Sequence, residues 1–587
     1  MTIQNPHVRP SRRGFLKGLG AAGAGLLAGS AGTGSATADL AVRPLGPGGY
    51  NRSGAGAPSS PGDFGRIFPN LPAFADVNDT VRAALLEVGM AGGIMDAGDQ
   101  LSAGPKALIV DPTVDGNPTV GDSYGSNPDN PTMSAGSTFV GQFIDHDITF
   151  DQTSRLGVSQ NPLISPNTRT PLLDLDSVFG GGPGIRPDLY VQQPDGSVGP
   201  KLKIGSGGVH EDVPRTPNGD GTYTALLGDP RNDENVIVAG MHCAHILFYN
   251  RVLDELSEHD LGRLPLARAH RADRANNYVA FLLARQVTLW HYQWLLVNEH
   301  LPQLAGQNVV NDVLAHGNRF YRPPAGDAFM PIEFGGACYR FGHSMVRPSY
   351  RANFTSGTRD STSPTADPFF ALVFDKNEPD FSDPVSYDRD DLLGGYPAPR
   401  RYIGWQTFFD LGDGNVKNNK KIDPLISSVL FTLPVPAIAP HTQTSPTVLP
   451  QRTLLRQLTW GLPSGQAIAR TMRVGALAPS DLDEIARVYA PFATSTPLWY
   501  YILAEAKAME DGVNLGPVGG RIVTETLIGL LRADPHSYLS VFPRFKPFLG
   551  TDLKLGSNLN PNITGNRSYT RAHFLYYAGV LTPGIYR

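Results

Sequence analysis

Cysteine is scarce in this sequence: 587 residues contain only Cys243 and Cys338, too few for a disulfide framework or a cysteine-rich metal site. The sequence leaves open whether these two pair. Basic residues are outnumbered as well, since 49 Lys and Arg against 54 Asp and Glu give a formal net charge of −5, and no run of Lys and Arg follows the N-terminus. Nucleic-acid binding needs a concentrated basic face, so this composition argues against a nucleic-acid partner.

Charged residues make up only 18% of the chain and hydrophobic residues 41%, which is enough apolar material for a large core. Glycine (65) and proline (51) are frequent and imply many long, ordered loops. Apolar residues recur at three- and four-residue steps, which predicts a mainly α-helical protein with few strands. The predicted helices are Asn78–Met90, Ser134–Phe150, Asp233–Leu256, Ala267–Leu301, Thr453–Leu458, Ser480–Tyr489, Leu498–Met509 and Pro517–Arg532.

No change in composition divides the chain after residue 76, so we expect residues 77–587 to form one large domain. Within it, residues 351–450 are rich in Pro, Asp and Gly, which predicts a long loop-rich excursion. Gln193–Gly205 contains Pro-Asp-Gly beside a short alternating run, which predicts a small hairpin.

The N-terminal segment has the pattern of an export signal. Ser11–Lys17 carries paired arginines, Gly18–Gly34 is apolar and built from small residues, and Ala36–Ala38 has the Ala-x-Ala form of a cleavage site. Gly and Ala dominate the apolar stretch, which makes it too weakly apolar for a stable membrane span. We therefore predict a twin-arginine signal at 1–38, a Gly/Pro-rich surface arm at 39–76, and a periplasmic or extracellular protein that is not inserted in a membrane.

Four segments carry residues suited to chemistry, and the first lies in the predicted helix Ser134–Phe150. Gln142 and His146 are four residues apart and share one helix face, while Asp145 and Asp147 flank the histidine. Taken alone, this pattern is more typical of a buried, hydrogen-bonded structural cluster.

The second segment opens the predicted helix Asp233–Leu256. Arg231 and Glu234 are three apart and point to one side of its first turn, although acidic residues are also what a helix N-terminus favours. Further along, His242 and His245 have no acid at metal spacing nearby, which is typical of core histidines rather than of a metal pair.

In the third segment His343 follows Gly342 on an otherwise apolar helix, where the missing side chain leaves room for a flat cofactor. In the fourth, alternate residues of an extended loop project to one side, and their oxygens suit Ca²⁺; an ordinary acidic turn is the simpler reading of that segment alone. The oxygens come from Thr170, the Leu172 carbonyl, Asp174 and Asp176, with Asp147 as a further ligand.

Together and in this order, the four segments resemble the animal-type haem peroxidases of the peroxidase–cyclooxygenase superfamily. The matching residues are Gln142, Asp145, His146 and Asp147 for the distal Gln-x-x-Asp-His-Asp, Thr170, Leu172, Asp174 and Asp176 for the calcium loop, Arg231 and Glu234 for Arg-x-x-Glu, and Arg340, Gly342 and His343 for the proximal Arg-x-Gly-His. The resemblance implies one large domain that holds haem b between a distal and a proximal helix and also binds Ca²⁺.

The resemblance also implies a role for each site residue. His146 moves a proton between the two oxygens of hydrogen peroxide, Arg231 stabilises the negative charge as the O–O bond breaks, and Gln142 holds a distal water or halide. The residues implied to hold the haem are His343 as axial iron ligand, Asp145 and Glu234 as sites of ester links, Arg340 and Arg456 as partners of the propionates, and Thr453 beside the proximal histidine.

Three positions differ from the family pattern. Asn235 stands where the mammalian leukocyte enzyme has a haem-bonded methionine, Asp176 replaces a serine and adds charge to the calcium loop, and Thr453 replaces the asparagine that usually supports the proximal histidine. The hydroxyl of Thr453 is a weaker partner and leaves His343 less basic.

We therefore predict a haem peroxidase that reduces hydrogen peroxide and oxidises a halide, thiocyanate or a small phenol. One alternative is a fatty-acid dioxygenase, but those enzymes carry a tyrosine three residues before the proximal histidine, where this sequence has Arg340, with Tyr339 one residue further away. Another is a haem-free calcium-binding surface protein, which has no need to retain His146, Arg231 and His343 together.

Overall fold

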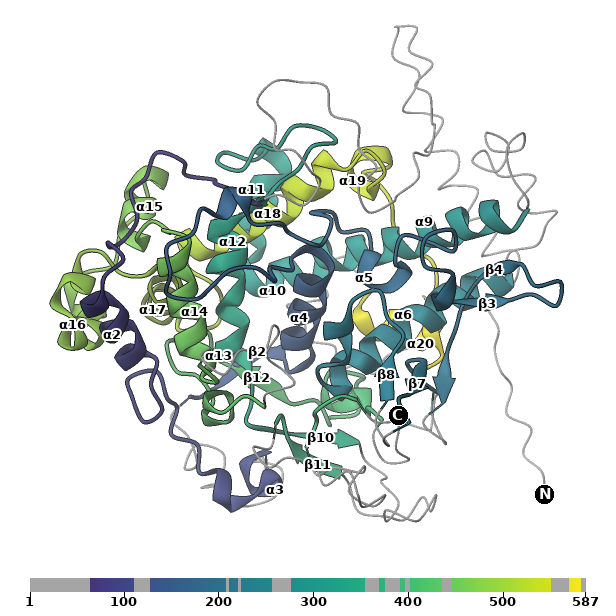
Figure 1. The fold of residues 1–587 in the computed structure, drawn as a ribbon, viewed down its shortest axis with the longest axis horizontal. Coiled ribbons are helices and arrows are strands. Elements are labelled where there is room, and N and C mark those ends of the chain that lie inside the picture. Colours follow the sequence, from purple (N-terminus) through teal and green to yellow (C-terminus); the bar gives the residue numbers. More distant parts are fainter. Residues whose placement is uncertain are drawn as a thin grey trace, which may run out of the picture.

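The computed structural model describes residues 64–109, 127–206, 211–219, 223–255, 276–353, 369–374, 391–395, 402–434, 446–550 and 569–581. Across these residues the protein is mainly helical, with a few very short strands in two-stranded sheets (Figure 1). The predicted fold class is therefore confirmed. The predicted signal at 1–38 and most of the predicted arm lie outside the described residues.

The bounds of the helices and strands are as follows. The helices are α2 (Asp79–Val88), α3 (Pro105–Ile109), α4 (Gly136–Ile148), α5 (Asp176–Phe179), α6 (Val236–Glu255), α9 (Asn276–Leu295), α10 (Leu301–Ala305), α11 (Gln307–His316), α12 (Ile332–Gly336), α13 (Gly342–Met345), α14 (Leu449–Thr459), α15 (Gly465–Met472), α16 (Asp483–Val488), α17 (Leu498–Glu510), α18 (Pro517–Ala533), α19 (Tyr538–Val541) and α20 (Arg571–Ala578). The strands are β1 (Phe64–Gly65), β2 (Asp129–Ser134), β3 (Tyr190–Gln192), β4 (Val198–Leu202), β5 (Gly205–Ser206), β6 (Glu211–Asp212), β7 (Arg215–Pro217), β8 (Tyr223–Ala225), β9 (Met330–Pro331), β10 (Ser349–Asn353), β11 (Phe369–Leu372) and β12 (Asn418–Lys420).

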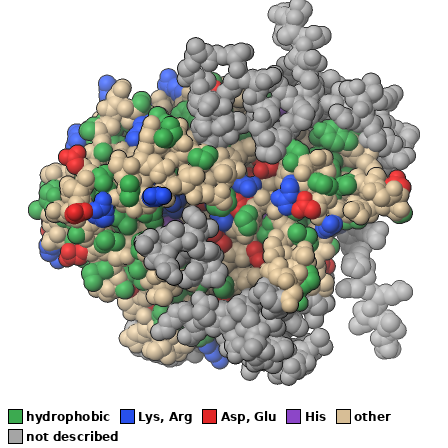
Figure 2. Space-filling model, in the orientation of Figure 1, with side chains coloured by type: hydrophobic (Ala, Val, Ile, Leu, Met, Phe, Trp, Pro, Cys, Tyr) green, Lys and Arg blue, Asp and Glu red, His purple; other side chains and the backbone are tan. Residues whose placement is uncertain are grey.

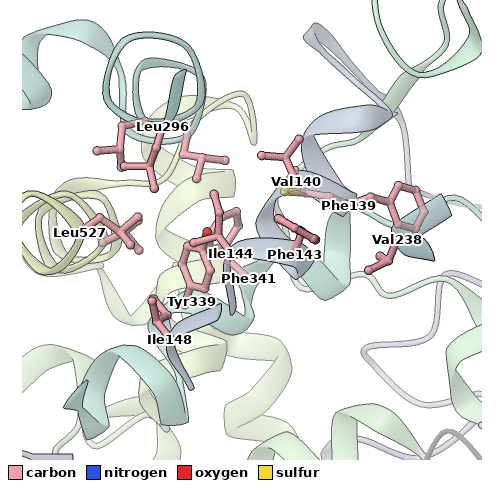
Figure 3. Close-up of a cluster of buried hydrophobic side chains, with 14 of the residues drawn as sticks. Phe139, Val140, Phe143, Ile144, Ile148, Val238, Leu296, Tyr339, Phe341 and Leu527 are labelled. Carbon is pink, nitrogen blue, oxygen red and sulfur yellow. The ribbon is translucent and has the colours of Figure 1, made fainter. Parts of the chain in front are cut away.

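Helix α4 runs through the middle of the molecule (Figure 1). It contacts α6 on one side and α13 on the other; α6 in turn contacts α9 and α20, whereas α14, α17 and α18 pack around the α13 side. Apolar residues at three- and four-residue steps on α4 enter one continuous core. Figure 3 shows part of this cluster, with Phe143, Ile144 and Ile148 of α4 lying among Tyr339, Phe341, Leu296 and Leu527. The polar residues of α4 are left to other faces of the helix, where they meet α6 and the loop before α5.

The two longest predicted helices are present, but the first begins later than predicted and the second changes to a π-helical segment near its end. Residues Pro230–Asp233 form a 3-10 turn capped by the Asp229 side chain, and α6 starts only at Val236, because Pro230 and the cap hold the chain in the tighter turn. Helix α9 runs on into a π-helical segment, Leu296–His300, before α10. Residues 267–275 of that prediction lie outside the described residues.

By length and mean hydropathy, α6 is the one helix among the described residues that is long and apolar enough to cross a membrane. Most of its apolar stretch is nevertheless buried inside the protein, and it packs against α4, α9 and α20. It is therefore a core helix, whose apolar residues cover its whole circumference because neighbouring helices surround it.

The described end of the predicted surface arm is anchored in the core. Strand β1 pairs in parallel with β9, and Phe64, Phe68 and Phe74 are buried. The buried carboxylate of Glu333 on α12 accepts hydrogen bonds from the backbone N–H groups of Ile67 and Phe68, both at 3.0 Å. Residues 64–76 thus differ from the expected surface linker, since three aromatic side chains bring this stretch into the interior.

Two further predictions concern loops. The predicted hairpin is present as β3 and β4, joined by a turn in which Asp195 accepts from the backbone N–H of Ser197. Of the excursion at 351–450, the described parts contain short strands and buried aromatic side chains such as Trp405 and Phe408. On the face shown in Figure 2, positive and negative side chains are interspersed rather than gathered by sign.

Candidate active site

The polar face of α4 meets the 3-10 turn that precedes α6. The Gln142 amide donates from Nε2 to Glu234 Oε2 at 3.0 Å, and its Oε1 accepts from Asn235 Nδ2 at 3.2 Å. Gln142 of α4 and Glu234 at the end of the 3-10 turn thus face each other across the junction. Asn235, which replaces the methionine of the leukocyte enzyme, orients this glutamine.

His146 lies one turn along the same face and is buried. Its Nδ1 is 3.0 Å from Asn232 Oδ1, and its Nε2 is 3.7 Å from Glu234 Oε2. Burial and then the positive charge of Arg231 lower the pKa of His146 to about 4, so the imidazole is neutral at pH 7. A neutral imidazole whose Nδ1 donates to an amide oxygen keeps its Nε2 lone pair for a proton.

Arg231 is held in place by contacts on several sides. Nε and Nη2 donate to the two oxygens of Asp229 at 3.1 and 2.8 Å, Nη2 also donates to the carbonyls of Thr149 and His146 at 2.6 and 3.2 Å, and the guanidinium lies over the Phe150 ring. Burial disfavours the charge, but Asp229 outweighs it and raises the pKa of Arg231 above its usual value. The cation is therefore permanent and fixed before any substrate arrives.

Asp229 itself is fully buried. Burial alone raises the pKa of a carboxyl, but Arg231, helped by His146 and Arg169, lowers the pKa of Asp229 to about 2. Its side chain also caps the 3-10 turn by accepting from the backbone N–H of Arg231. One aspartate thus shapes the turn and orients the arginine that follows it.

Two carboxyl groups border the same space. Asp145 Oδ2 is 4.0 Å from Arg231 Nη1, and Asp145 Oδ1 accepts from Thr149 Oγ1 at 2.8 Å. Burial raises the pKa of Glu234 to about 7, against the attraction of Arg231. Both side chains keep part of their surface accessible, 30% for Asp145 and 25% for Glu234, so each is available to a bound group.

His343, the predicted proximal histidine, lies in the short helix α13. Its Nδ1 is 3.5 Å from Thr453 Oγ1, at the limit of a hydrogen bond, and the hydroxyl proton of Thr453 goes to the Leu449 carbonyl at 3.2 Å. The Trp499 ring packs edge-on against the imidazole at 5.8 Å between centroids. Burial and then the charge of Arg340 lower the pKa of His343 to about 3, so the ring is neutral, as a metal ligand must be.

Guanidinium groups surround this proximal side. Arg340 donates from Nε to the Gly335 carbonyl at 2.9 Å, and burial and then the charge of Arg456 lower its pKa to about 10. Arg456 forms an ion pair with Asp151 and lies over the Trp460 ring. The charge of Asp145 raises the pKa of Arg340 and the charge of Arg231 lowers it, so both groups are near enough to influence Arg340.

These residues fit a haem group. A Cβ built on Gly342 meets nothing within 4 Å, which leaves open space beside His343 for a flat ring. The side chain of His343 is neutral, and Arg340 is a half-buried cation without a carboxylate partner among its described contacts, as a propionate needs. Arg456 has Asp151 as a competing partner, so Arg340 is the stronger propionate candidate.

The predicted calcium loop lies beside α4. The fully buried Asp147 carboxylate accepts from the backbone N–H of Leu175 at 3.0 Å and from Ser177 Oγ at 3.1 Å. Thr170 Oγ1 donates to Asp174 Oδ1 at 3.2 Å. Leu172 lies between these two residues in the same turn and is half-buried.

Two arginines partly neutralise the acidic side chains of this loop. Arg285 lies 3.4 Å from Asp174, and Arg169 lies 3.3 Å from Asp176 and 3.1 Å from Asp229. Burial raises the pKa of Asp174 despite Arg285, and burial followed by the charge of Asp174 raises that of Asp147. Within the described parts of the chain, no group of three His, Cys, Asp or Glu side chains is arranged to hold a metal ion.

Several partners of the site were missed by the sequence analysis. Asp229 and Asn232 belong to the hexapeptide that contains Arg231 and Glu234, so their proximity to the motif was a usable signal. Trp499 has no such signal, because it reaches His343 only through the packing of α17 against the turn before α13. His242 and His245 are buried, and His245 donates from Nδ1 to the Met241 carbonyl and stacks on Phe143. Cys243 and Cys338 are both buried, and no disulfide joins them.

Comparison with known proteins agrees with this geometry. A sequence model described as animal haem peroxidase matches residues 157–381, a stretch that holds the loop before α5, Arg231 and His343. The fold is similar to that of peroxidase A from Dictyostelium discoideum, with a TM-score of 0.56 and 15% identity over 93% of this chain and 99% of that one. It is also similar to a fatty acid α-dioxygenase from Arabidopsis thaliana, with a TM-score of 0.51 and 14% identity over 92% of this chain and 79% of that one. No curated protein matches the sequence. The sequence model of the animal haem peroxidase family thus covers the segment from the loop before α5 to beyond His343, and the fold of this chain is similar to that of a peroxidase and of a fatty acid α-dioxygenase.

Proposed function

We propose that this protein is a haem peroxidase that reduces hydrogen peroxide and oxidises a small donor: a halide, thiocyanate or a phenol. The observation that carries the proposal is the pairing of a neutral, oriented His146 with a permanently charged, fixed Arg231 at one site. A base and a cation held side by side suit the cleavage of an O–O bond, because one takes the proton and the other stabilises the charge that builds up.

Haem, when bound, would supply the redox-active iron that takes up the two oxidising equivalents of a peroxide and passes them to a donor. His343 would hold the iron, and Arg340 would bind a propionate. His146 takes the proton from one peroxide oxygen at Nε2 and returns it to the other, so that the leaving oxygen departs as water. Arg231 stabilises the negative charge from Nη1, the nitrogen that faces Asp145, while its other nitrogens are held by Asp229 and the Thr149 carbonyl.

The choice between peroxidase and dioxygenase turns on the residues before His343. Arg340 occupies the position three residues before the histidine, where a dioxygenase has its reactive tyrosine. Tyr339 is buried, stacks on Phe334, and its hydroxyl has no hydrogen-bond partner among the described residues. Its ring therefore belongs to the aromatic core shown in Figure 3, which favours the peroxidase.

Three further proposals concern cofactors and location. Asp145 and Glu234 would form ester links to the haem by self-oxidation: each carboxyl oxygen would replace a hydrogen on a haem carbon, and one hydrogen peroxide per link would be reduced to two waters. Both carboxyls lie beside His146 or Arg231 and remain partly accessible. Asp147, Thr170, Leu172, Asp174 and Asp176 bind Ca²⁺, whose charge relieves the repulsion among the three buried or half-buried carboxylates. The protein is exported in folded form by the twin-arginine route and acts in the periplasm or outside the cell.

The test is the absorption spectrum of the purified protein before and after a slight excess of hydrogen peroxide. A Soret band that shifts with peroxide and recovers with bromide, thiocyanate or a phenol supports the proposal. His343→Ala must lose the haem signal, whereas the exposed His316→Ala must keep it. Oxygen uptake with a long-chain fatty acid, without turnover of peroxide, assigns the protein to the dioxygenases instead. Failure of the protein to bind haem leaves a calcium-binding surface protein as the better account.

The ester proposal has its own readout. Extraction with acidified organic solvent leaves haem on the wild-type protein and releases it from the variant with both Asp145→Ala and Glu234→Ala. Complete release from the wild type contradicts the ester links.

A further inference from the structure

A buried asparagine joins two histidines next to the active site. Asn232 is fully buried and is the residue directly after Arg231. Its Oδ1 lies 3.0 Å from Nδ1 of His146, and its Nδ2 lies 2.9 Å from Nδ1 of His242 on α6. One side chain therefore bridges the distal helix α4 and the core helix α6.

The chemistry of the amide decides which ring nitrogens carry protons. An amide oxygen only accepts and an amide nitrogen only donates, so His146 must carry its proton on Nδ1, and the Nδ1 of His242 must be the acceptor. The Nε2 lone pair of His146 is then free on the side of Glu234. In the opposite tautomer, Nε2 holds a proton and is unable to accept another from a substrate.

The amide is itself fixed on both sides. His242 is buried and its ring meets the Phe143 ring edge-on, which limits its rotation. The backbone N–H of Asn232 donates to the Asp229 carbonyl at 3.1 Å within the 3-10 turn. The same 3-10 turn thus positions two side chains: the Arg231 guanidinium, which is the cation of the site, and the Asn232 amide, which holds His146.

We propose that Asn232 is a positioning residue for the proposed peroxidase reaction: it holds His146 as the Nδ1–H tautomer with Nε2 free to accept the proton of an incoming acidic ligand. This inference rests on the proposed function, since it assigns His146 as the base. It adds that the base depends on a fully buried residue that hydrogen-bonds the ring nitrogen opposite the proton-accepting one. His242 fixes the orientation of the Asn232 amide by accepting a hydrogen bond from its Nδ2.

The test measures cyanide binding as well as peroxide turnover, with haem-loaded protein. Hydrogen cyanide gives up its proton to the distal base when cyanide binds haem iron, so its association rate reports on His146 even in a protein that does not turn over peroxide. Asn232→Leu fills a similar volume and removes both hydrogen bonds. Because positioned acid–base groups contribute ~10²–10⁴-fold, we expect its association rate to fall by about 10-fold or more, with a parallel fall in the rate with peroxide.

Two variants separate positioning from loss of structure. Asn232→Asp keeps an oxygen that accepts from His146 and must keep most of the association rate. Asn250→Leu removes a different buried asparagine, which lies on the neighbouring helix α6. The Asn250 side chain makes two hydrogen bonds of 2.9 Å with the backbone of Leu202. This control must leave the cyanide rate essentially unchanged even where it lowers the melting temperature.

The outcomes distinguish this inference from the proposed function. A haem-loaded Asn232→Leu protein with the wild-type cyanide rate overturns the role of Asn232. Wild-type protein that binds cyanide but does not react with peroxide contradicts the peroxidase, while the cyanide comparison still decides the role of Asn232. Should Asn232→Leu fail to fold, nitrogen NMR of ¹⁵N-histidine-labelled wild-type protein in its diamagnetic ferrous carbon monoxide form decides the question. A proton on Nδ1 of His146 supports the proposal, and a proton on Nε2 overturns it.

Discussion

Arg231 shows how a single side chain is prepared for its task. Asp229 accepts hydrogen bonds from Nε and Nη2 of Arg231, and the carbonyls of Thr149 and His146 also accept from Nη2. The Phe150 ring covers the guanidinium plane. Such preorganisation means that little rearrangement is needed when negative charge develops nearby. The planar fork of arginine is essential here, because a lysine ammonium is a point charge without fixed donor directions.

Replacing Arg231 by lysine is therefore expected to slow the reaction with peroxide by roughly 10²–10³-fold, the usual cost of losing a preorganised donor. Stopped-flow measurement of the Soret change against peroxide concentration checks this. Arg521→Lys is the matched control, since Arg521 on α18 also lies near two carboxylates, Asp312 and Glu525, but outside the site. Equal rates for Arg231→Lys and the wild type contradict the role given to Arg231.

At this scale the sequence predicts residue types better than it predicts their partners. His146, Arg231 and Glu234 lie together as their spacing indicated, because helix geometry puts residues three or four apart on one face. The orientation of His146 depends on Asn232, and the surroundings of His343 depend on Trp499 and Thr453, more than 100 residues away along the chain. Local periodicity carries no information about such contacts.

Among the secondary-structure elements, the junction of α17 and α18 depends on one buried carboxylate. Glu505 on α17 accepts from the backbone N–H groups of Val518 and Gly519 in the first turn of α18, at 3.0–3.2 Å. Burial raises the pKa of Glu505 to about 7, against the lowering effect of these hydrogen bonds. The native protein thus binds a proton at Glu505 between pH 4.5 and 7 that the unfolded chain, with its ordinary pKa near 4.5, does not bind.

Because the folded state binds the extra proton, the contribution of Glu505 to the free energy of unfolding falls as the pH rises from 4.5 to 7. The size of the change is up to about 3 kcal/mol, from the difference between the two pKa values. Glu505→Gln lacks this titration, so its stability relative to the wild type should increase from pH 5 to pH 8. Urea midpoints at the two pH values test this, with the exposed Glu510→Gln of the same helix as control. A constant difference between Glu505→Gln and the wild type contradicts the prediction.

The elements themselves were largely predictable, within limits set by local chemistry. Helices α2, α4, α17 and α18 begin and end within a few residues of their predicted bounds, because their apolar spacing and end residues agree. The late start of α6 follows from the Asp229 cap and Pro230, which favour a tighter turn than the periodicity alone suggests. The parallel pairing of β1 with β9 joins segments far apart in the chain, and two residues on each side give no strand pattern to detect.

At the scale of the whole molecule, the loop proposed to bind calcium connects several regions. Asp147 ties the end of α4 to this loop, and Arg169 bridges Asp176 of the loop and Asp229, which binds Arg231. A cation bound among these carboxylates would therefore stabilise contacts between elements, beyond the loop itself.

Calcium is expected to raise the melting temperature of the protein, and a chelator to lower it. A ligand that binds only the folded state stabilises it by roughly 2.7 kcal/mol at a concentration about 100 times its Kd. Differential scanning calorimetry with calcium, with magnesium and with chelator checks this. Asp176→Asn should weaken the effect, whereas Asp195→Asn, in the exposed turn between β3 and β4, should leave it unchanged. Identical melting temperatures with calcium and with chelator contradict the calcium site.

The hydrogen bonds that Glu333 accepts from the backbone of Ile67 and Phe68 bear on the order in which the molecule is assembled during synthesis. The backbone of these two residues leaves the ribosome early, whereas Glu333 follows much later and Trp499 later still. At a translation rate of roughly 5–20 residues per second, Trp499 is synthesised some tens of seconds after helix α4. The site proposed to hold haem is thus completed late in translation: a chain cut short before α17 contains His146, Arg231 and His343 but lacks Trp499, whose ring packs against His343.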